Sequence, residues 1–198
     1  AIHGDVRTRP WTVLESAPER FAATLESRDF PDFNFPFPLR FRQLLTLDGE
    51  RLRIQFSIEN AGERRAPVGL GFHPFIRRRL TRRDDDVVVV VPAERVYPAV
   101  GCLPIGPARL VEGAEDLRSV RALGATNLDH CYTGLTRREL RLIYQGSRVE
   151  VRFTLDGCFG HVVVYAPNTA TGSAASFVAV EPVTNANDGF NLLARGEE

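Results

Sequence analysis

The sequence predicts an all-β fold, a large antiparallel β-sandwich formed as a single domain over residues 1–198. Many short apolar segments alternate with turn residues, which is typical of a sandwich built from successive hairpins. No helical periodicity of any length is present. A length of 198 residues is ordinary for an undivided β-sandwich and allows a substantial core.

The first half of the chain contains two predicted hairpins. Its predicted strands are residues 11–15, 20–26, 41–47 and 51–58. Pro18 marks the first turn, and Asp48-Gly49 between two apolar-alternating segments is the strongest hairpin signal in the chain.

Residues 30–38 interleave four phenylalanines with three prolines. Each proline removes a backbone donor, so this segment cannot be a central strand. The aromatic rings suit either the wall of a sugar site or a lid over the core, and their spacing favours the lid.

The second half contains further strands around a long connection. The predicted strands are residues 87–91, 140–144, 149–155, 161–165 and 177–180. The five consecutive valines of 87–91 indicate a strand buried on both faces. Residues 92–124 are rich in Pro and Gly and are expected to be irregular, with 114–123 as a candidate short helix.

Charge and cysteine content exclude several partner classes. The 25 basic residues are all arginine and balance 25 acidic residues, so neither nucleic acid nor an anionic membrane is an expected partner. No apolar run is long enough to span a bilayer.

Three cysteines without a C-x-x-C pair fit a reducing cytoplasm and indicate neither a disulfide framework nor a zinc site. The sequence contains no methionine, so we expect either that Ala1 follows a removed initiator or that the chain is a fragment of a longer one.

The segment Gly69-Leu70-Gly71-Phe72-His73-Pro74-Phe75 is the central motif. Its two glycines allow a close backbone approach or a positive φ. Pro74 biases His73 toward an extended backbone, so the imidazole is held by the chain. This segment alone does not distinguish a functional histidine from a core histidine at a strand end.

Four motifs occur together in one order. They are Ile2-His3-Gly4, the central motif with the preceding Asn60-Ala61-Gly62, Leu128-Asp129-His130-Cys131-Tyr132-Thr133-Gly134, and Phe177-Val178-Ala179-Val180-Glu181-Pro182-Val183-Thr184. The ordered set resembles the aldose 1-epimerase (galactose mutarotase) family. The resemblance implies a large twisted antiparallel β-sandwich, the galactose mutarotase-like supersandwich, with N-terminal strands and an upstream arginine missing from this chain.

The resemblance also implies an acid–base mechanism and roles for four residues. His73 would be the acid and Glu181 the base that together open and close a hexose ring, without metal or organic cofactor. Asp129 would accept hydrogen bonds from sugar hydroxyls, and His3 would orient the sugar or help to protonate it. The alternatives are a turn aspartate for Asp129 and an exposed strand carboxylate for Glu181.

Both candidate catalytic residues precede a proline, Pro74 or Pro182, which favours extended backbone and a rigid platform. We expect His73 and Glu181 to face one cleft, with their functional atoms several ångströms apart and room for a sugar ring between them. His130 and His161 match no motif and are expected to be structural.

The expected function is an aldose 1-epimerase acting on a free or modified hexose as a monomer or homodimer. A hexose-6-phosphate mutarotase is the enzyme alternative, with arginines of 77–83 or Arg121 holding the phosphate. A non-catalytic carbohydrate-binding protein of the same fold is the other. The arginines of 77–83 are followed by Asp84–Asp86, and we expect these charges to pair or to face solvent rather than a ligand.

Overall fold

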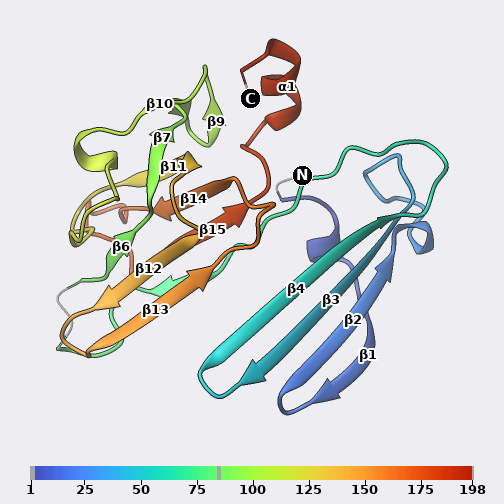
Figure 1. Ribbon diagram of the computed structural model, residues 1–198, viewed down its shortest axis with the longest axis horizontal. Coiled ribbons are helices and arrows are strands. Elements are labelled where there is room, and N and C mark those ends of the chain that lie inside the picture. Colours follow the sequence, from blue (N-terminus) through green and yellow to red (C-terminus); the bar gives the residue numbers. More distant parts are fainter. Residues whose placement is uncertain (1–2, 84–85, 198) are drawn as a thin grey trace. The chain divides into compact units, whose positions relative to one another are not determined.

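The computed structural model describes residues 3–83 and 86–197, which divide into two compact units, Ala1–Val68 and Gly69–Glu198. Both units are built from antiparallel strands, which confirms the predicted all-β class (Figure 1). Whether the two units form one domain stays a prediction, so each is described by itself.

The first unit is a four-stranded meander with strand order β1-β2-β3-β4. Its elements are η1 (Val6–Thr8), β1 (Thr12–Ala17), β2 (Arg20–Glu26), η2 (Ser27–Asp29), β3 (Leu39–Asp48) and β4 (Arg51–Asn60). The predicted hairpin at Asp48-Gly49 is confirmed, because Asp48 pairs with Arg51 across a turn in which Gly49 has φ +56°.

One face of this sheet carries a small aromatic core, in which Leu25, Leu39 and Phe41 are buried. The aromatic rings of 30–38 pack on these residues, so the lid interpretation of that loop is confirmed.

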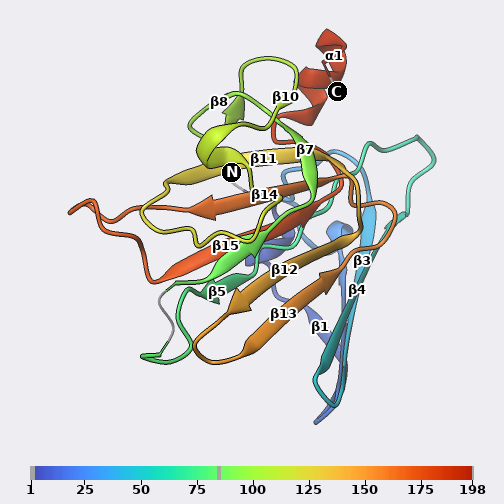
Figure 2. The same ribbon diagram turned by 60° about the vertical axis from the view of Figure 1, so that its left-hand side comes forward.

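The second unit contains a six-stranded and a three-stranded antiparallel sheet (Figure 2). The larger sheet has the order β10 (Arg109–Leu110), β7 (Ala93–Val96), β11 (Leu128–Leu135), β14 (His161–Ala166), β15 (Phe177–Val183) and β5 (Phe75–Arg77). The smaller sheet has the order β13 (Val149–Thr154), β12 (Glu139–Tyr144) and β6 (Val88–Val90). The remaining elements are β8 (Ala99–Val100), β9 (Leu103–Pro104), η3 (Gly113–Glu115) and α1 (Gly189–Arg195).

The two sheets of this unit share one apolar core. Val162, Val164, Val178 and Val180 project from β14 and β15 into the same cluster as the β12 and β6 side chains. The valine run is buried as predicted except at Val90, which is half-buried; Val87 and Val89 have 0% exposure and Val88 has 3%. The four valines that project from β14 and β15 into this cluster are even-numbered, and successive residues of a strand point to opposite faces of the sheet. The odd-numbered residues of β14 and β15 therefore lie on the other face of the large sheet.

Several sequence-based expectations about the second unit are corrected. Residues 92–124 are not wholly irregular, because β7 lies inside the large sheet, with Ala93 and Val96 buried and two exposed charged residues between them. The candidate helix 114–123 is not found, and only the three-residue η3 forms there. Asp129 lies in β11, so the alternative of a turn aspartate is not supported. Across residues 3–83 and 86–197, no helix has both the length and the apolar character to cross a membrane.

Candidate active site

The central motif runs antiparallel to β15. Phe72 N–H donates to the Pro182 carbonyl at 3.0 Å, and Thr184 N–H donates to the Leu70 carbonyl at 2.9 Å. Gly71 is required for this approach, since a Cβ there would lie 2.6 Å from Val183 Cγ1. The predicted close approach is therefore confirmed for this glycine.

Pro182 fits inside β15 because of the direction of its backbone. Its carbonyl, and hence the position that an N–H would occupy, faces the central motif rather than β14. The β14–β15 ladder therefore loses no hydrogen bond, and Glu181 is held in a regular strand beside it.

The register of this pairing places His73 opposite Glu181. Gly71 pairs with Val183 and Phe75 with Ala179, and the position midway between these pairs joins residues 73 and 181. His73 Nε2 lies 3.3 Å from Glu181 Oε1. The two residues lie together as expected, but the expected gap wide enough for a sugar ring is not found.

Glu181 lies in an environment that disfavours its charged form. Its side chain is 10% exposed, against 30% for His73. Burial, followed by the negative charge of Asp129, raises the Glu181 pKa from 4.5 to about 7. A carboxyl group with this pKa can both take and release a proton near neutral pH.

Asp129 lies on the same sheet face as the pair. It faces Tyr165 in the β11–β14 ladder, and Tyr165 faces Ala179 on β15, two residues before Glu181. Because paired residues and alternate residues share a face, Asp129 and Glu181 project to the same side. Burial is the main cause that raises the Asp129 pKa.

Aromatic side chains continue this face away from the pair. The Phe75 ring stacks on His73 with ring centroids 4.6 Å apart, and Phe177 lies edge-on to Phe75 at 5.1 Å. Tyr165 is 6.2 Å from Phe177. Phe75 is 60% exposed, so its ring offers an apolar surface beside the acid–base pair. The sequence did not identify Phe75 or Phe177 as site residues, although Phe75 ends the central motif and Phe177 begins the motif that contains Glu181.

The other histidines differ in their surroundings. His130 Nε2 lies 3.2 Å from Glu115 Oε1, and its Nδ1 accepts the Asp129 backbone N–H, which fits the expected structural role. His161 stacks on the Tyr97 ring at 6.0 Å. His3 is exposed in the first unit, with φ +64°, so its part in sugar binding stays a prediction.

Arg78 is a buried structural residue rather than a solvated one. It is 3% exposed, its Nε donates to Asp86 Oδ1 at 2.9 Å, and its Nη2 donates to the Gly124 carbonyl. The expected pairing with the aspartate run is confirmed at Asp86. The other two aspartates, Asp84 and Asp85, lie outside the described residues.

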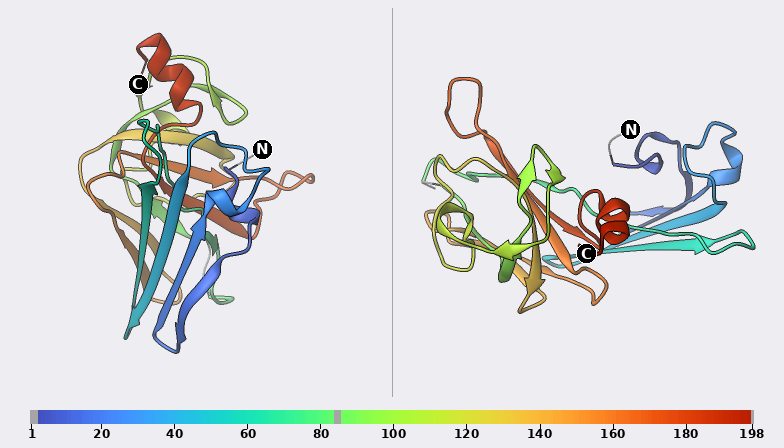
Figure 3. Two further views of the ribbon diagram at one scale, coloured as in Figure 1. Left: turned by 90° about the vertical axis from the view of Figure 1, so that its right-hand side faces the viewer. Right: turned by 90° about the horizontal axis from the view of Figure 1, so that it is seen from above.

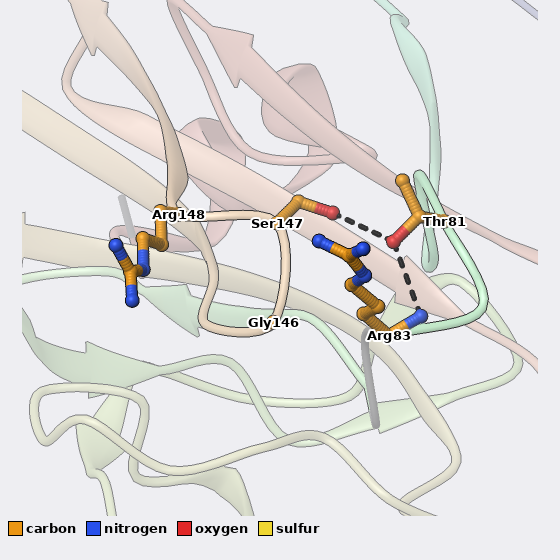
Figure 4. Close-up of a pocket in the computed structure, with 5 residues that line it drawn as sticks. All are labelled: Thr81, Arg83, Gly146, Ser147 and Arg148. Carbon is orange, nitrogen blue, oxygen red and sulfur yellow. Dashed lines mark hydrogen bonds between the residues drawn. The ribbon is translucent and has the colours of Figure 1, made fainter.

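Two hollows lie elsewhere in the second unit. One is lined by Thr81, Arg83 and residues 146–148, with Thr81 Oγ1 and Ser147 Oγ 3.0 Å apart (Figure 4). The other is lined by arginines 77–79, Asp86 and residues 173–176. Neither is lined by His73, Asp129 or Glu181, so the expected cleft at the candidate catalytic residues is not one of them.

The described residues contain no group of three or more His, Cys, Asp and Glu side chains placed to hold a metal ion. The imidazole of His73 and the carboxyl group of Glu181 lie side by side on a sheet face that Asp129 shares. A β-sheet protein with this pair has the groups needed for acid–base chemistry on a small polar molecule.

The model of the aldose 1-epimerase family matches residues 1–198, and the chain belongs to that family. It is 25% identical over 194 residues to the uncharacterized protein YihR of Escherichia coli (strain K12), covering 96% of this chain and 60% of YihR.

Solved structures share the fold. A galactose mutarotase related enzyme from Lactobacillus acidophilus superposes with a TM-score of 0.75 at 17% identity, covering 92% of this chain and 63% of that one. A galactose mutarotase-like protein from Lactobacillus casei gives 0.72 at 19% identity, covering 93% and 64%. The fold is therefore the predicted galactose mutarotase-like one, and this chain spans less than two thirds of the length of each of these relatives.

Proposed function

We propose that this protein is an aldose 1-epimerase that interconverts the α and β anomers of a hexose by opening and closing its ring. The observation that carries the proposal is the His73–Glu181 pair, 3.3 Å apart on one sheet face, with the Glu181 pKa raised to about 7. Membership of the aldose 1-epimerase family supports it.

In the proposed reaction, ionised Glu181 takes the proton from the anomeric hydroxyl while protonated His73 gives one to the ring oxygen. The bond between C1 and the ring oxygen breaks, the anomeric carbon becomes an aldehyde, and rotation about C1–C2 turns its other face toward the ring hydroxyl. Closure runs the two transfers in reverse, so Glu181 and His73 regain their starting protonation states.

The short separation of the pair is compatible with this reaction. The anomeric oxygen and the ring oxygen are bonded to the same carbon, so both can meet groups that lie side by side. The sugar would then lie over the pair and replace their mutual contact, rather than fill a gap between them. Such contacts often change when substrate binds.

Asp129 and the aromatic rings would bind the rest of the sugar. The Asp129 carboxylate accepts hydrogen bonds from hydroxyl groups, while Phe75 and Phe177 meet the apolar C–H face of the ring. Asp129 also acts on the chemistry, because its charge contributes to the raised Glu181 pKa. The catalytic and binding roles of these residues thus rest on one face of the large sheet.

The two alternative functions, a hexose-6-phosphate mutarotase and a non-catalytic carbohydrate-binding protein, have less support than the epimerase. Arg78 is committed to Asp86, and the hollow that arginines 77–79 line contains none of the proposed catalytic residues, so the phosphosugar alternative loses its main argument. A purely carbohydrate-binding protein does not need a buried carboxyl group whose pKa lies near neutrality beside an imidazole.

The test is anomeric exchange measured by NMR on a panel of unmodified aldohexoses at neutral pH. We expect exchange well above the uncatalysed rate for at least one sugar. Binding of a sugar, measured by calorimetry, without any acceleration of exchange would favour the carbohydrate-binding alternative.

A further inference from the structure

A second hollow, of about 650 Å³, lies at the end of β5 and is lined by arginines 77–79, Asp86 and the segment 173–176. The last segment belongs to the connection between β14 and β15, which extends beyond the sheet in Figures 2 and 3. None of the residues assigned to catalysis or sugar binding lines this hollow, so the proposed function leaves it without a role.

Arg78 brings an incompletely satisfied charge to the hollow. Its Nε and Nη2 donate to Asp86 and Gly124, but its Nη1 is buried without a hydrogen-bond partner among the described residues. A guanidinium has five N–H donors, and a buried donor without an acceptor is costly. Because Nη1 is buried, Arg78 contributes positive charge to the lining rather than a direct contact for an ion that enters from solvent.

Arg77 and Arg79 add two further positive charges. Both are exposed, and neither forms an ion pair with a residue in the described ranges 3–83 and 86–197. The backbone at Arg77 and Arg78 is anchored, because the Tyr144 hydroxyl donates to the Arg77 carbonyl at 2.6 Å and Arg78 N–H donates to the Ser176 carbonyl at 2.9 Å. The Arg77 side chain therefore extends from an anchored strand end, and Arg79 follows two residues later.

The lining has the composition of an oxyanion site. Three arginines meet one aspartate among the described lining residues, and Ser173 and Ser176 supply exposed hydroxyl groups. Planar guanidinium groups match the paired oxygens of phosphate and sulfate, with charge-assisted hydrogen bonds. The volume exceeds that of a single ion and leaves room for part of a larger molecule.

We propose that this hollow binds a phosphate or sulfate group, either as a free ion or as a substituent of a larger molecule. None of its lining residues belongs to the proposed catalytic pair, but Arg77 pairs with Phe177, which is part of the proposed sugar-binding surface. Phosphate binding in the hollow does not depend on the epimerase proposal.

The test is calorimetric titration of the chain with inorganic phosphate at constant ionic strength, with chloride in the reference. We expect a Kd on the order of 1 mM. Arg77→Ala and Arg79→Ala should each weaken binding about tenfold, the loss expected for one charge-assisted hydrogen bond. Arg83→Ala is the matched control, because it removes the same charge from the neighbouring loop but lines the Thr81 hollow (Figure 4).

Titrations with a hexose 6-phosphate and the corresponding hexose distinguish the two sources of the anion. Tighter binding of the hexose phosphate than of inorganic phosphate, lost in Arg79→Ala, would indicate a substituent of a larger molecule. Equal binding would indicate the free ion. The proposal is overturned if neither phosphate compound binds, or if Arg83→Ala loses binding while Arg77→Ala and Arg79→Ala retain it. Anomeric exchange of unmodified sugars, measured on the same variants, reports separately on the epimerase proposal.

Discussion

His73 and Glu181 occupy opposite positions of one antiparallel register, and His73 Nε2 lies 3.3 Å from Glu181 Oε1. Leu70 and Phe72 of the central motif form backbone hydrogen bonds with Thr184 and Pro182 of the facing segment. The even-numbered residues of the motif therefore form the hydrogen-bonded pairs. Residue 73 therefore belongs to a non-hydrogen-bonded pair, the kind in which facing side chains are closest. The backbone pairing thus brings together two residues separated by more than a hundred positions in the chain.

The first prediction concerns the proposed acid and base. Glu181→Gln keeps the shape and the hydrogen-bonding capacity of the side chain but removes the base. Anomeric exchange should fall by about a hundred- to ten-thousand-fold, while sugar binding persists. His73→Asn should cost a comparable factor, because the ring oxygen loses its proton donor. Exchange is measured by NMR and binding by calorimetry.

Glu139→Gln is the control for this prediction, since Glu139 is an exposed carboxylate at the start of β12. It should leave exchange unchanged. Near wild-type exchange in Glu181→Gln would contradict the assignment of Glu181 as the base.

A second prediction concerns Asp129. Asp129→Asn removes an acceptor for sugar hydroxyls, so KM should rise with a smaller change in kcat. It also removes a negative charge that raises the Glu181 pKa, so the acidic limb of the pH–rate profile should move to lower pH. Asp48→Asn is the control, because Asn-Gly suits the β3–β4 hairpin as well as Asp-Gly does. An unchanged acidic limb in Asp129→Asn would separate Asp129 from the titration of Glu181.

The sequence predicted the local features of the site better than its geometry. The prolines after His73 and Glu181 indicated extended backbone. Glu181 lies in β15, and His73 lies between the Gly71–Val183 bridge and the start of β5, opposite Glu181. The distance between them depends on which strands pair and in what register, which no local pattern specifies. The effect of Asp129 on the Glu181 pKa could not be predicted for the same reason, because it depends on two further strand pairings, β11 with β14 and β14 with β15.

Two other differences between expectation and structure concern β7 and Arg78. The segment that forms β7 was predicted to be irregular because residues 92–124 are rich in Pro and Gly and weakly periodic. Two charged residues between Ala93 and Val96 weaken its apolar pattern. Arg78 belongs to an arginine run that is typical of a solvated loop, yet its pairing with Asp86 allows burial at 3% exposure. Both outcomes depend on partners that the local sequence does not specify.

A third prediction is the pH dependence of stability. The folded protein binds a proton at Glu181 with a pKa of about 7, whereas the unfolded value is 4.5. The folded state therefore holds more protons between these values, and the free energy of unfolding should decrease as pH rises through this window. The loss from this group is on the order of 3 kcal/mol and is complete above pH 7.

Glu181→Gln cannot ionise, so this variant should lack that loss and be more stable than the wild type above pH 7. Urea unfolding of both proteins from pH 4.5 to 8 measures the difference in their unfolding free energies. Because the other titrating groups are the same in both proteins, their contributions cancel from this difference to first order. Parallel stability curves for the two proteins would contradict the raised pKa of Glu181.

The last prediction tests the close packing of the central motif on β15. In Gly71→Ala the new Cβ would lie 2.6 Å from Val183 Cγ1, so the central motif must move away from the strand and carry His73 with it. We expect a loss of about 1–3 kcal/mol in unfolding free energy and a decrease in anomeric exchange of at least about tenfold. Gly157→Ala is the matched control, because a Cβ at Gly157 meets no atom within 4 Å. The double variant Gly71→Ala/Val183→Ala removes the clashing methyl group and should recover part of both losses, giving a coupling free energy between the two sites. If Gly71→Ala behaved like Gly157→Ala, the motif would not pack on β15 closely enough to hold His73 against Glu181.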